Sequence, residues 1–212
     1  MIARRVYTTL FQPLLSAPIA PTPTTLRMST TTRSKKGAYT YEYPRPGLTV
    51  DAIIIKRPTA ANGATKQSHA ELLLINRKNE PFKNKWAIPG GFVDENESLD
   101  AAASRELLEE TSVPPSKAYM TQIGMFGDPG RDPRGWVVSA AYAAIVPDTI
   151  PVKAGDDAQD AQWYALNNLP PLAFDHKLII KTACRRLAET PQVSSDPELR
   201  RQLTEAAERL EG

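Results

Sequence analysis

The sequence predicts an α/β fold in which a mixed β-sheet is sandwiched between α-helices. Three observations indicate this class. Apolar, β-branched segments with the length of strands interleave with longer segments of strong helix formers. These segments do not follow a strict strand–helix–strand repeat, which argues against a purely parallel sheet. With 212 residues, 41% of them hydrophobic, the chain is long enough for one packed domain and short extensions.

The expected strands are apolar segments that lie between loops rich in Gly, Pro and polar residues. The first covers residues 48–55 (LTVDAIII) and is bounded by Gly47 and Pro58. A short apolar stretch follows at residues 86–88. Further strands are expected over residues 71–77, 119–126, 136–146 and 162–164.

Two helices are expected within the domain. Residues 99–111 contain strong helix formers without Gly or Pro, and Ser98 precedes them as an N-cap. Pro114-Pro115 prevents continuation, so this helix should end near Ser112. The second helix is expected over residues 174–189, with an apolar stripe formed by Leu178, Ile179 and Leu187.

A last amphipathic helix is expected at residues 194–212, after the folded domain at residues 46–190. Capping residues and a proline near the first helical position open it. We expect it to pack on the domain or on a second subunit, because one of its faces is apolar. That face consists of Leu199, Leu203, Ala207 and Leu210.

The first 40 residues form a leader that we do not expect to belong to the fold. Residues 1–36 contain six basic residues and no acidic one, and they are rich in Ser and Thr. This composition is typical of a mitochondrial transit peptide, and a disordered leader without a targeting role is the alternative. Met28 would serve as an internal start for a cytosolic form, so the expected location is mitochondrial or cytoplasmic.

Composition excludes several classes of protein. Six of the 26 basic residues lie in the leader, which leaves 20 against 24 acidic residues and a net charge of −4 downstream. A nucleic-acid-binding domain would be basic, so no nucleic-acid partner is expected. No apolar run is long enough to span a membrane. The only cysteine, Cys184, cannot form an internal disulfide and fits a reducing compartment as a packed thiol.

Three carboxylates on the first predicted helix point to chemistry. Glu106, Glu109 and Glu110 stand at positions i, i+3 and i+4, so they share one helix face. Clustered carboxylates on a packed helix suit hard divalent cations, which prefer oxygen ligands. A solvated acidic face is the alternative interpretation of the same spacing.

A longer motif surrounds these carboxylates and resembles the Nudix box, G-x5-E-x7-R-E-U-x-E-E-x-G-U, in which U is aliphatic. The match runs without a gap from Gly91 to Val113. One position departs from the motif, since Ser112 replaces a glycine that ends the helix in a left-handed turn; this should cost about 1 kcal/mol. The matching residues are Gly91, Glu97, Arg105, Glu106, Leu107, Glu109, Glu110 and Val113.

The resemblance implies a role for each matching residue. Glu109 and Glu110 would be the main metal ligands, with the carbonyl of Gly90 as a third. Glu106 would be a further ligand or the base that deprotonates the attacking water. Arg105 would form a salt bridge with Glu97 and brace the loop against the helix. The expected cofactor is Mg²⁺, with Mn²⁺ as the alternative.

The flanking segments resemble one Nudix branch, which contains ADP-ribose pyrophosphatases and Nudix-related transcriptional regulators. Residues 127–135 contain its RDPRG segment, residues 155–158 and 169–176 are similar to its downstream segments, and the likeness covers residues 47–190. Candidate phosphate ligands are Arg77, Arg131 and Arg134. Candidates to stack a purine are Trp86, Phe92, Phe126 and Trp136. Asp156, Asp157 and Asp160 are expected in a loop, as turn residues or as an extra acid.

The sequence therefore predicts a pyrophosphate hydrolase whose substrate is a small nucleotide, with ADP-ribose cleaved to AMP and ribose 5-phosphate. Other nucleotide sugars, dinucleotides and oxidised nucleotides are the alternative substrates. A ligand-sensing regulator is the alternative of another class, although only 22 residues follow Thr190, too few for a winged-helix domain. A homodimer is implied by the resemblance alone. His69 and His176 lack metal-ligand spacing and are assigned no role.

Overall fold

The computed structural model describes residues 40–58, 69–147, 150–154 and 158–211, and residues from Arg45 on form one compact unit. The leader lies outside the described residues except for its last one, and so do the two candidate acids Asp156 and Asp157. No helix in the described part is long and apolar enough to cross a membrane.

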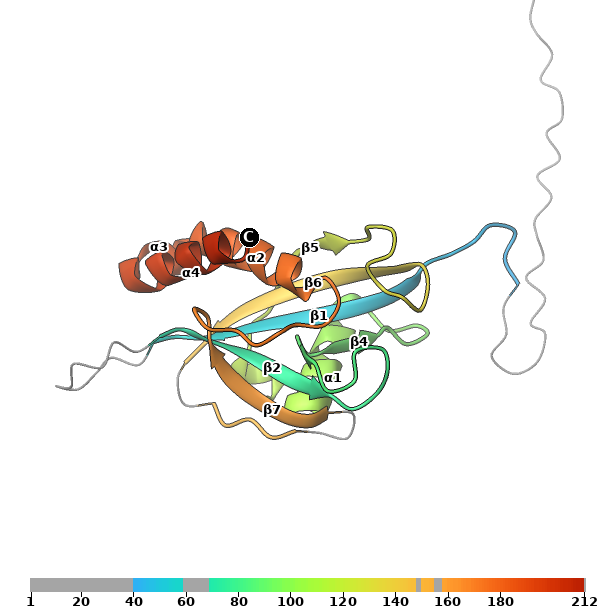
Figure 1. Ribbon diagram of the computed structural model, residues 1–212, viewed down its shortest axis with the longest axis horizontal. Coiled ribbons are helices and arrows are strands. Elements are labelled where there is room, and N and C mark those ends of the chain that lie inside the picture. Colours follow the sequence, from blue (N-terminus) through green and yellow to red (C-terminus); the bar gives the residue numbers. More distant parts are fainter. Residues whose placement is uncertain (1–39, 59–68, 148–149, 155–157, 212) are drawn as a thin grey trace, which may run out of the picture. The chain divides into compact units, whose positions relative to one another are not determined.

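A mixed seven-stranded sheet forms the centre of the described unit (Figure 1). Its strands run in the order β3-β2-β1-β6-β5, with β4 paired to β1 and β7 paired to β2. The central strands β1 and β6 are parallel, and all other pairs are antiparallel. The strands are β1 (Gly47–Lys56), β2 (Glu71–Arg77), β3 (Trp86–Ala87), β4 (Gly90–Phe92), β5 (Thr121–Phe126), β6 (Val137–Val146) and β7 (Ala158–Ala165).

One edge of β1 is shared between two partners. The end of β1 pairs with β2 at Ile55 and Lys56, whereas its first half pairs with β4 at Thr49, Val50 and Asp51. The other edge of β1 pairs with β6 along its whole length. This division brings the short glycine strand β4 beside the middle of β1, at the point where Asp51 lies opposite Gly90.

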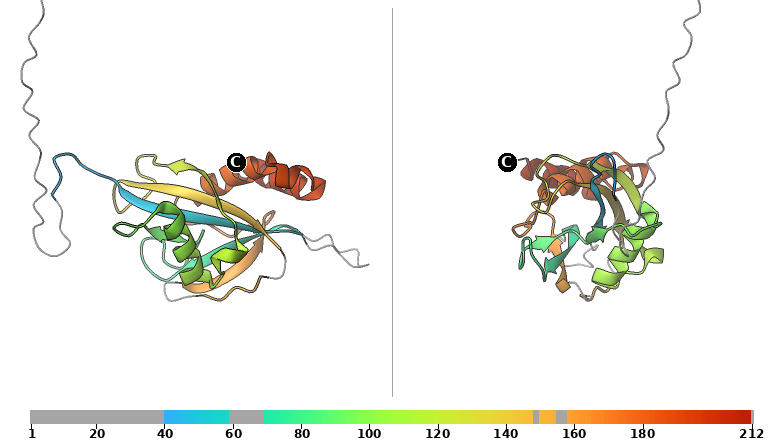
Figure 2. Two further views of the ribbon diagram at one scale, coloured as in Figure 1. Left: turned by 180° about the vertical axis from the view of Figure 1, so that it is seen from behind. Right: turned by 90° about the vertical axis from the view of Figure 1, so that its right-hand side faces the viewer.

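Helices cover both faces of the sheet, as the two views of Figure 2 show. Helix α1 (Leu99–Thr111), followed by the 3-10 turn η1 (Pro115–Lys117), lies on one face. The other face is covered by the three C-terminal helices, which lie together in Figure 1. These are α2 (His176–Ala188), α3 (Pro191–Ser194) and α4 (Pro197–Arg209).

Alternation along β1 divides the core between the two faces. Ile53 and Ile55 pack with apolar residues of α2 and α4, whereas Ala52 and Ile54 pack with Leu107 of α1. Successive side chains of a strand point to opposite faces, so an apolar strand with helices on both sides buries every residue. The unbroken apolar run in the sequence therefore follows from the three-layer arrangement.

The C-terminal helix packs on the domain, which is one of the two roles expected for it. Leu199, Leu203, Ala206 and Ala207 are buried in the same core as α2. Gln202 is also buried, and its side-chain oxygen accepts a hydrogen bond of 2.6 Å from the N–H of Ala70, just before β2. The helix thus closes one face of the sheet.

Three features of the sheet differ from the expectation. Strand β7 extends from Ala158 to Ala165, because β2 pairs with nearly its whole length. It includes Asp160, for which the sequence predicts a loop. Strand β5 begins at Thr121, after η1. Strand β4 was not expected, because glycine disfavours strands and only the β1 edge gives it a partner.

Both expected boundaries of α1 are confirmed. The Ser98 hydroxyl accepts a hydrogen bond from the N–H of Ala101, and the helix ends at Ser112 in a left-handed conformation with φ 59° and ψ 15°. This is the conformation in which the Nudix box has its glycine.

Replacement of Ser112 by glycine should therefore stabilise the protein. Removal of the side chain relieves the left-handed strain, and the larger entropy of the unfolded glycine chain offsets part of the gain. We expect the free energy of unfolding to rise by about 0.5–1 kcal/mol and the midpoint of thermal unfolding by about 2 °C. Ser116→Gly is the matched control, because Ser116 does not have a positive φ. This variant should be less stable than the wild type.

Candidate active site

The candidate site lies where α1 faces the two glycines of β4. Glu110 is buried, and its Oε2 accepts a hydrogen bond of 2.8 Å from the N–H of Gly90. This contact fixes the predicted third metal ligand, the Gly90 backbone, next to the carboxylates of the helix.

A side chain on either glycine of β4 would clash with a neighbouring group in the present arrangement. A Cβ atom on Gly90 would lie 2.2 Å from the backbone oxygen of Val50. A Cβ atom on Gly91 would lie 2.4 Å from Oε1 of Glu106. Both distances are far below a van der Waals contact, so the glycines allow β4 to approach β1 on one side and the Glu106 carboxylate on the other.

Arg105 braces the loop against the helix, as expected. Its guanidinium forms a two-pronged salt bridge with Glu97, with N–O distances of 2.8 and 2.9 Å. It also donates to Oε1 of Glu106 at 2.7 Å, to Oε2 of Glu109 at 3.2 Å and to the backbone oxygen of Phe92 at 3.0 Å. The hydrogen bonds from Arg105 lower the pKa of Glu97 to about 2, so this brace stays charged at all ordinary pH values.

The three predicted metal ligands differ in their surroundings. Burial raises the pKa of Glu106 above its ordinary value, and the hydrogen bond and charge of Arg105 offset only part of this rise. The Glu109 side chain is 58% exposed, whereas Glu110 is buried. In the described part of the chain no three carboxylates converge on one point, so a cation would draw Glu106 and Glu109 away from Arg105. The hard oxygen donors present still fit Mg²⁺ or Mn²⁺.

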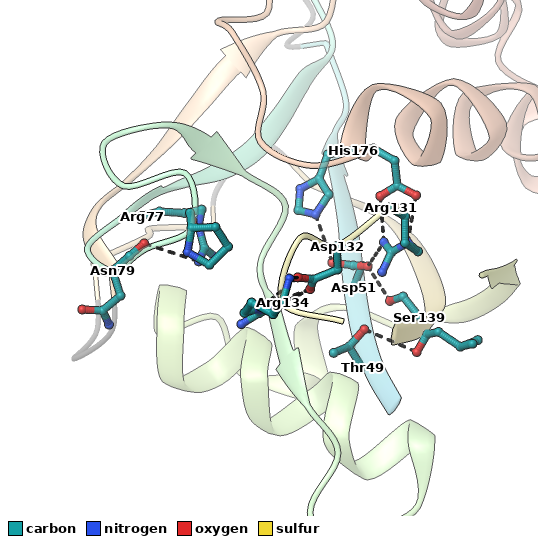
Figure 3. A network of polar contacts seen from close by, with 12 residues as sticks. Thr49, Asp51, Arg77, Asn79, Arg131, Asp132, Arg134, Ser139 and His176 are labelled. Carbon is teal, nitrogen blue, oxygen red and sulfur yellow. Dashed lines mark hydrogen bonds and ion pairs between the residues drawn. The ribbon is translucent and has the colours of Figure 1, made fainter. Parts of the chain in front are cut away.

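A small polar cavity of about 70 Å³ opens beside the two glycines. Its volume is that of several water molecules. Figure 3 shows several of the polar side chains that line the cavity, among them Asp51, Arg134 and His176. Strands β1 and β4, the loop between β5 and β6, and the start of α2 supply its walls. All three arginines predicted to bind phosphate line it, namely Arg77, Arg131 and Arg134.

The three arginines differ in how far their charge is already neutralised. Arg131 is 6% exposed and forms a two-pronged salt bridge with Asp175, at 2.9 and 2.7 Å, so its fork is occupied. Arg134 also forms a two-pronged salt bridge, with Asp132 at 3.0 and 2.6 Å, but it is 41% exposed and can reach a ligand at the surface. Arg77 donates to the backbone oxygens of Pro81 and Asn79 and forms no direct salt bridge among the described residues, although Glu110, Asp132 and Glu80 are near enough to interact with its charge. Arg77 and Arg134 are therefore the better placed for an anionic ligand, and Arg131 holds the loop.

Trp86 does not line the cavity, contrary to the expected role in substrate binding. Its ring packs edge-on against Tyr164 with centroids 4.8 Å apart, and it borders the apolar core. The aromatic side chains at the cavity are instead Phe92 and Phe174. The Arg134 guanidinium lies 5.0 Å from the Phe92 ring centroid and 5.6 Å from that of Phe174.

Two further cavity residues, Asp51 and His176, were missed in the sequence. Asp51 is 7% exposed, and Ser139 donates a 2.5 Å hydrogen bond to its Oδ2. Burial raises the pKa of Asp51 to about 6 and lowers that of His176 to about 3. One signal was visible, since Asp51 is the only charged residue in the apolar run of β1, and a buried charge there requires an explanation.

The raised pKa of Asp51 predicts a pH-dependent stability difference for Asp51→Asn. The carboxyl of Asp51 binds a proton more tightly in the native state than in the unfolded state. Proton binding therefore makes its full contribution to the free energy of unfolding below pH 4, and this contribution is lost as the pH rises through 6. Relative to the wild type, the variant should gain up to about 3 kcal/mol between pH 4 and pH 7.5. Urea unfolding at both pH values measures this difference, and an equal difference at both would contradict it.

Comparisons with known proteins agree with this arrangement. The model of the NUDIX domain matches residues 56–183, more than half of the chain. The chain belongs to the Nudix family. An ADP-ribose pyrophosphatase of Methanocaldococcus jannaschii is 43% identical over 145 residues, which are 68% of this chain and 76% of that protein.

Two other similar Nudix proteins are linked by their names to ADP-ribose. The ADPR responsive transcriptional repressor NtrR of Acinetobacter baylyi is 34% identical over 74% of this chain and 60% of its own length. The NUDIX domain of Shewanella oneidensis NrtR, solved in complex with ADP ribose, is 34% identical with a TM-score of 0.60. That match covers 68% of this chain and 90% of the solved one.

Proposed function

We propose that this Nudix protein hydrolyses ADP-ribose to AMP and ribose 5-phosphate with the help of a divalent cation. The observation that supports this most directly is the location of the cavity, whose lining includes Arg77, Arg134 and Gly90, the residue that donates a hydrogen bond to Glu110 of the carboxylate helix. The likeness to an ADP-ribose pyrophosphatase over two thirds of the chain indicates the same substrate.

Each group has a defined task in this proposal. Arg77 and Arg134 bind the phosphate oxygens and hold the pyrophosphate beside β4. Glu106, with its raised pKa, accepts the proton of the attacking water. Glu109, Glu110 and the Gly90 carbonyl would hold Mg²⁺, or Mn²⁺, which would supply a Lewis acid at the phosphate.

A substrate panel tests the proposal. The full chain is incubated with Mg²⁺ and ADP-ribose, other nucleotide sugars, dinucleotides or nucleoside triphosphates, and the products are separated chromatographically. We expect the highest kcat/KM for ADP-ribose, with AMP released in equal amount to ribose 5-phosphate. A chelator should abolish turnover, and added Mg²⁺ should restore it. Tight binding of ADP-ribose without turnover of any substrate would favour a sensor like the repressor.

Two predictions from the sequence extend the proposal. We propose a homodimer, which light scattering after size exclusion measures directly. From the basic, acid-free leader we propose a mitochondrial location for the full chain and a cytoplasmic one for a form that starts at Met28. Imaging of the two forms fused to a fluorescent protein tests this pair of locations.

A further inference from the structure

Two polar atoms face each other across the cavity without a hydrogen bond between them. Oδ1 of Asp51 and Nε2 of His176 are 3.6 Å apart, which is too long for a direct hydrogen bond. Both residues line the cavity, and Figure 3 shows the histidine ring directed at the carboxylate. Both are almost entirely buried, with 7% of Asp51 and 4% of His176 exposed.

The remaining polar atoms of the pair are already used. The N–H of Ile88 donates to Nδ1 of His176 at 2.9 Å, so the proton of the neutral ring is on Nε2. The Ser139 hydroxyl donates to Oδ2 of Asp51, and the Arg131 guanidinium lies 3.8 Å from the same oxygen. An acceptor, Oδ1, and a donor, Nε2–H, therefore remain side by side.

These two atoms point to a ligand. Among the described residues, no fully buried side-chain nitrogen or oxygen lacks a hydrogen-bond partner. Oδ1 of Asp51 and Nε2 of His176 have no hydrogen-bond partner in this part of the chain, so neither atom is fully buried, and both residues line the cavity. Buried polar atoms without partners are costly, which favours their retention for a bound group.

The acceptor on Asp51 and the donor on His176 together indicate which chemical group binds between them. A phosphate oxygen would be repelled by the carboxylate and gains only one donor. A hydroxyl both donates and accepts, so it can lie within hydrogen-bond distance of both atoms at once. We propose that Asp51 and His176 recognise a ribose hydroxyl of the substrate. This inference rests on the proposed hydrolysis of ADP-ribose and adds a specificity-determining pair to it.

The position of Asp51 is close to the predicted metal-binding backbone. Asp51 pairs in register with Gly90, whose N–H contacts Glu110. A hydroxyl bound by Asp51 therefore lies close to the pyrophosphate, and it can belong to either ribose, because both riboses of ADP-ribose are attached directly to the pyrophosphate.

The alternative is that Asp51 serves only to orient Arg131 through charge. Deoxy analogues of ADP-ribose distinguish the two roles, because each lacks one hydroxyl of one of the two riboses. The measurements compare kcat and KM for ADP-ribose and each analogue, using the full chain as wild type, Asp51→Asn and His176→Asn. The asparagine at position 176 keeps an acceptor for Ile88 but shortens the donor arm.

For the wild type, we expect kcat/KM for one analogue to be about 10–100-fold lower than for ADP-ribose. For each of the two variants, kcat/KM for the same analogue should be less than about 3-fold lower than for ADP-ribose. Ser139→Ala is the matched control, since it alters only the Oδ2 side and should keep the wild-type discrimination. Thermal unfolding establishes that each variant is folded.

Equal discrimination by wild type and both variants for every analogue would overturn the inference and leave Asp51 as a support for Arg131. That result is distinct from failure of the proposed function, in which the wild type itself would not hydrolyse ADP-ribose.

Discussion

Glu109→Gln is expected to reduce kcat for ADP-ribose by at least about 10²–10³-fold while the protein stays folded. Glutamine keeps the size of the side chain but removes the charge that a divalent cation requires. Because Glu109 is 58% exposed, its replacement should change the free energy of unfolding by less than about 0.5 kcal/mol. The cation concentration for half-maximal activity should also rise.

Glu95→Gln is the matched control for this prediction. Glu95 is an exposed glutamate in the loop just before α1, and the same chemical change there should leave kcat unchanged. If Glu109→Gln retained full activity and metal dependence, Glu109 would be only a surface partner of Arg105, with which it forms a 3.2 Å contact. The metal site would then have to be sought at Glu106 and Glu110.

Local signals in the sequence were enough to predict most of the fold. Helix α1 begins and ends where its capping residue and the following prolines predict, and Ser112 takes the left-handed conformation of the glycine that it replaces. The buried strand β1 was found from its β-branched run. These features depend on interactions between near neighbours along the chain, which a sequence shows directly.

What the sequence could not show depends on contacts between distant segments. Strand β4 exists because β1 offers it an edge, and Asp51 and His176 meet only when β1 and α2 are assembled. The Trp86 side chain is of a type that stacks on purines, but it packs against Tyr164 of β7 at the edge of the core. Arg131 and Arg134 each pair with an aspartate, and they differ in exposure, which is 6% for Arg131 and 41% for Arg134 and follows from how the loop packs.

Alanine substitutions at the two glycines of β4 should have different effects on activity and on stability. In Gly91→Ala, the new methyl group meets the Glu106 carboxylate, which lies at the end of a flexible side chain and can move. We expect kcat to fall about 10²-fold because Glu106 is displaced, with a loss of stability of only about 1 kcal/mol. In Gly90→Ala, the methyl group meets the backbone of β1, so we expect a loss of about 3 kcal/mol or more together with activity.

A double variant tests whether Gly91 acts through Glu106. If it does, Gly91→Ala should cost almost nothing further in kcat once Glu106 is replaced by glutamine, because the group that the methyl displaces is already without function. Comparison of kcat for the wild type, the two single variants and the double variant measures this coupling. Additive losses would mean that Gly91 affects the site by another route, such as the position of the Gly90 carbonyl.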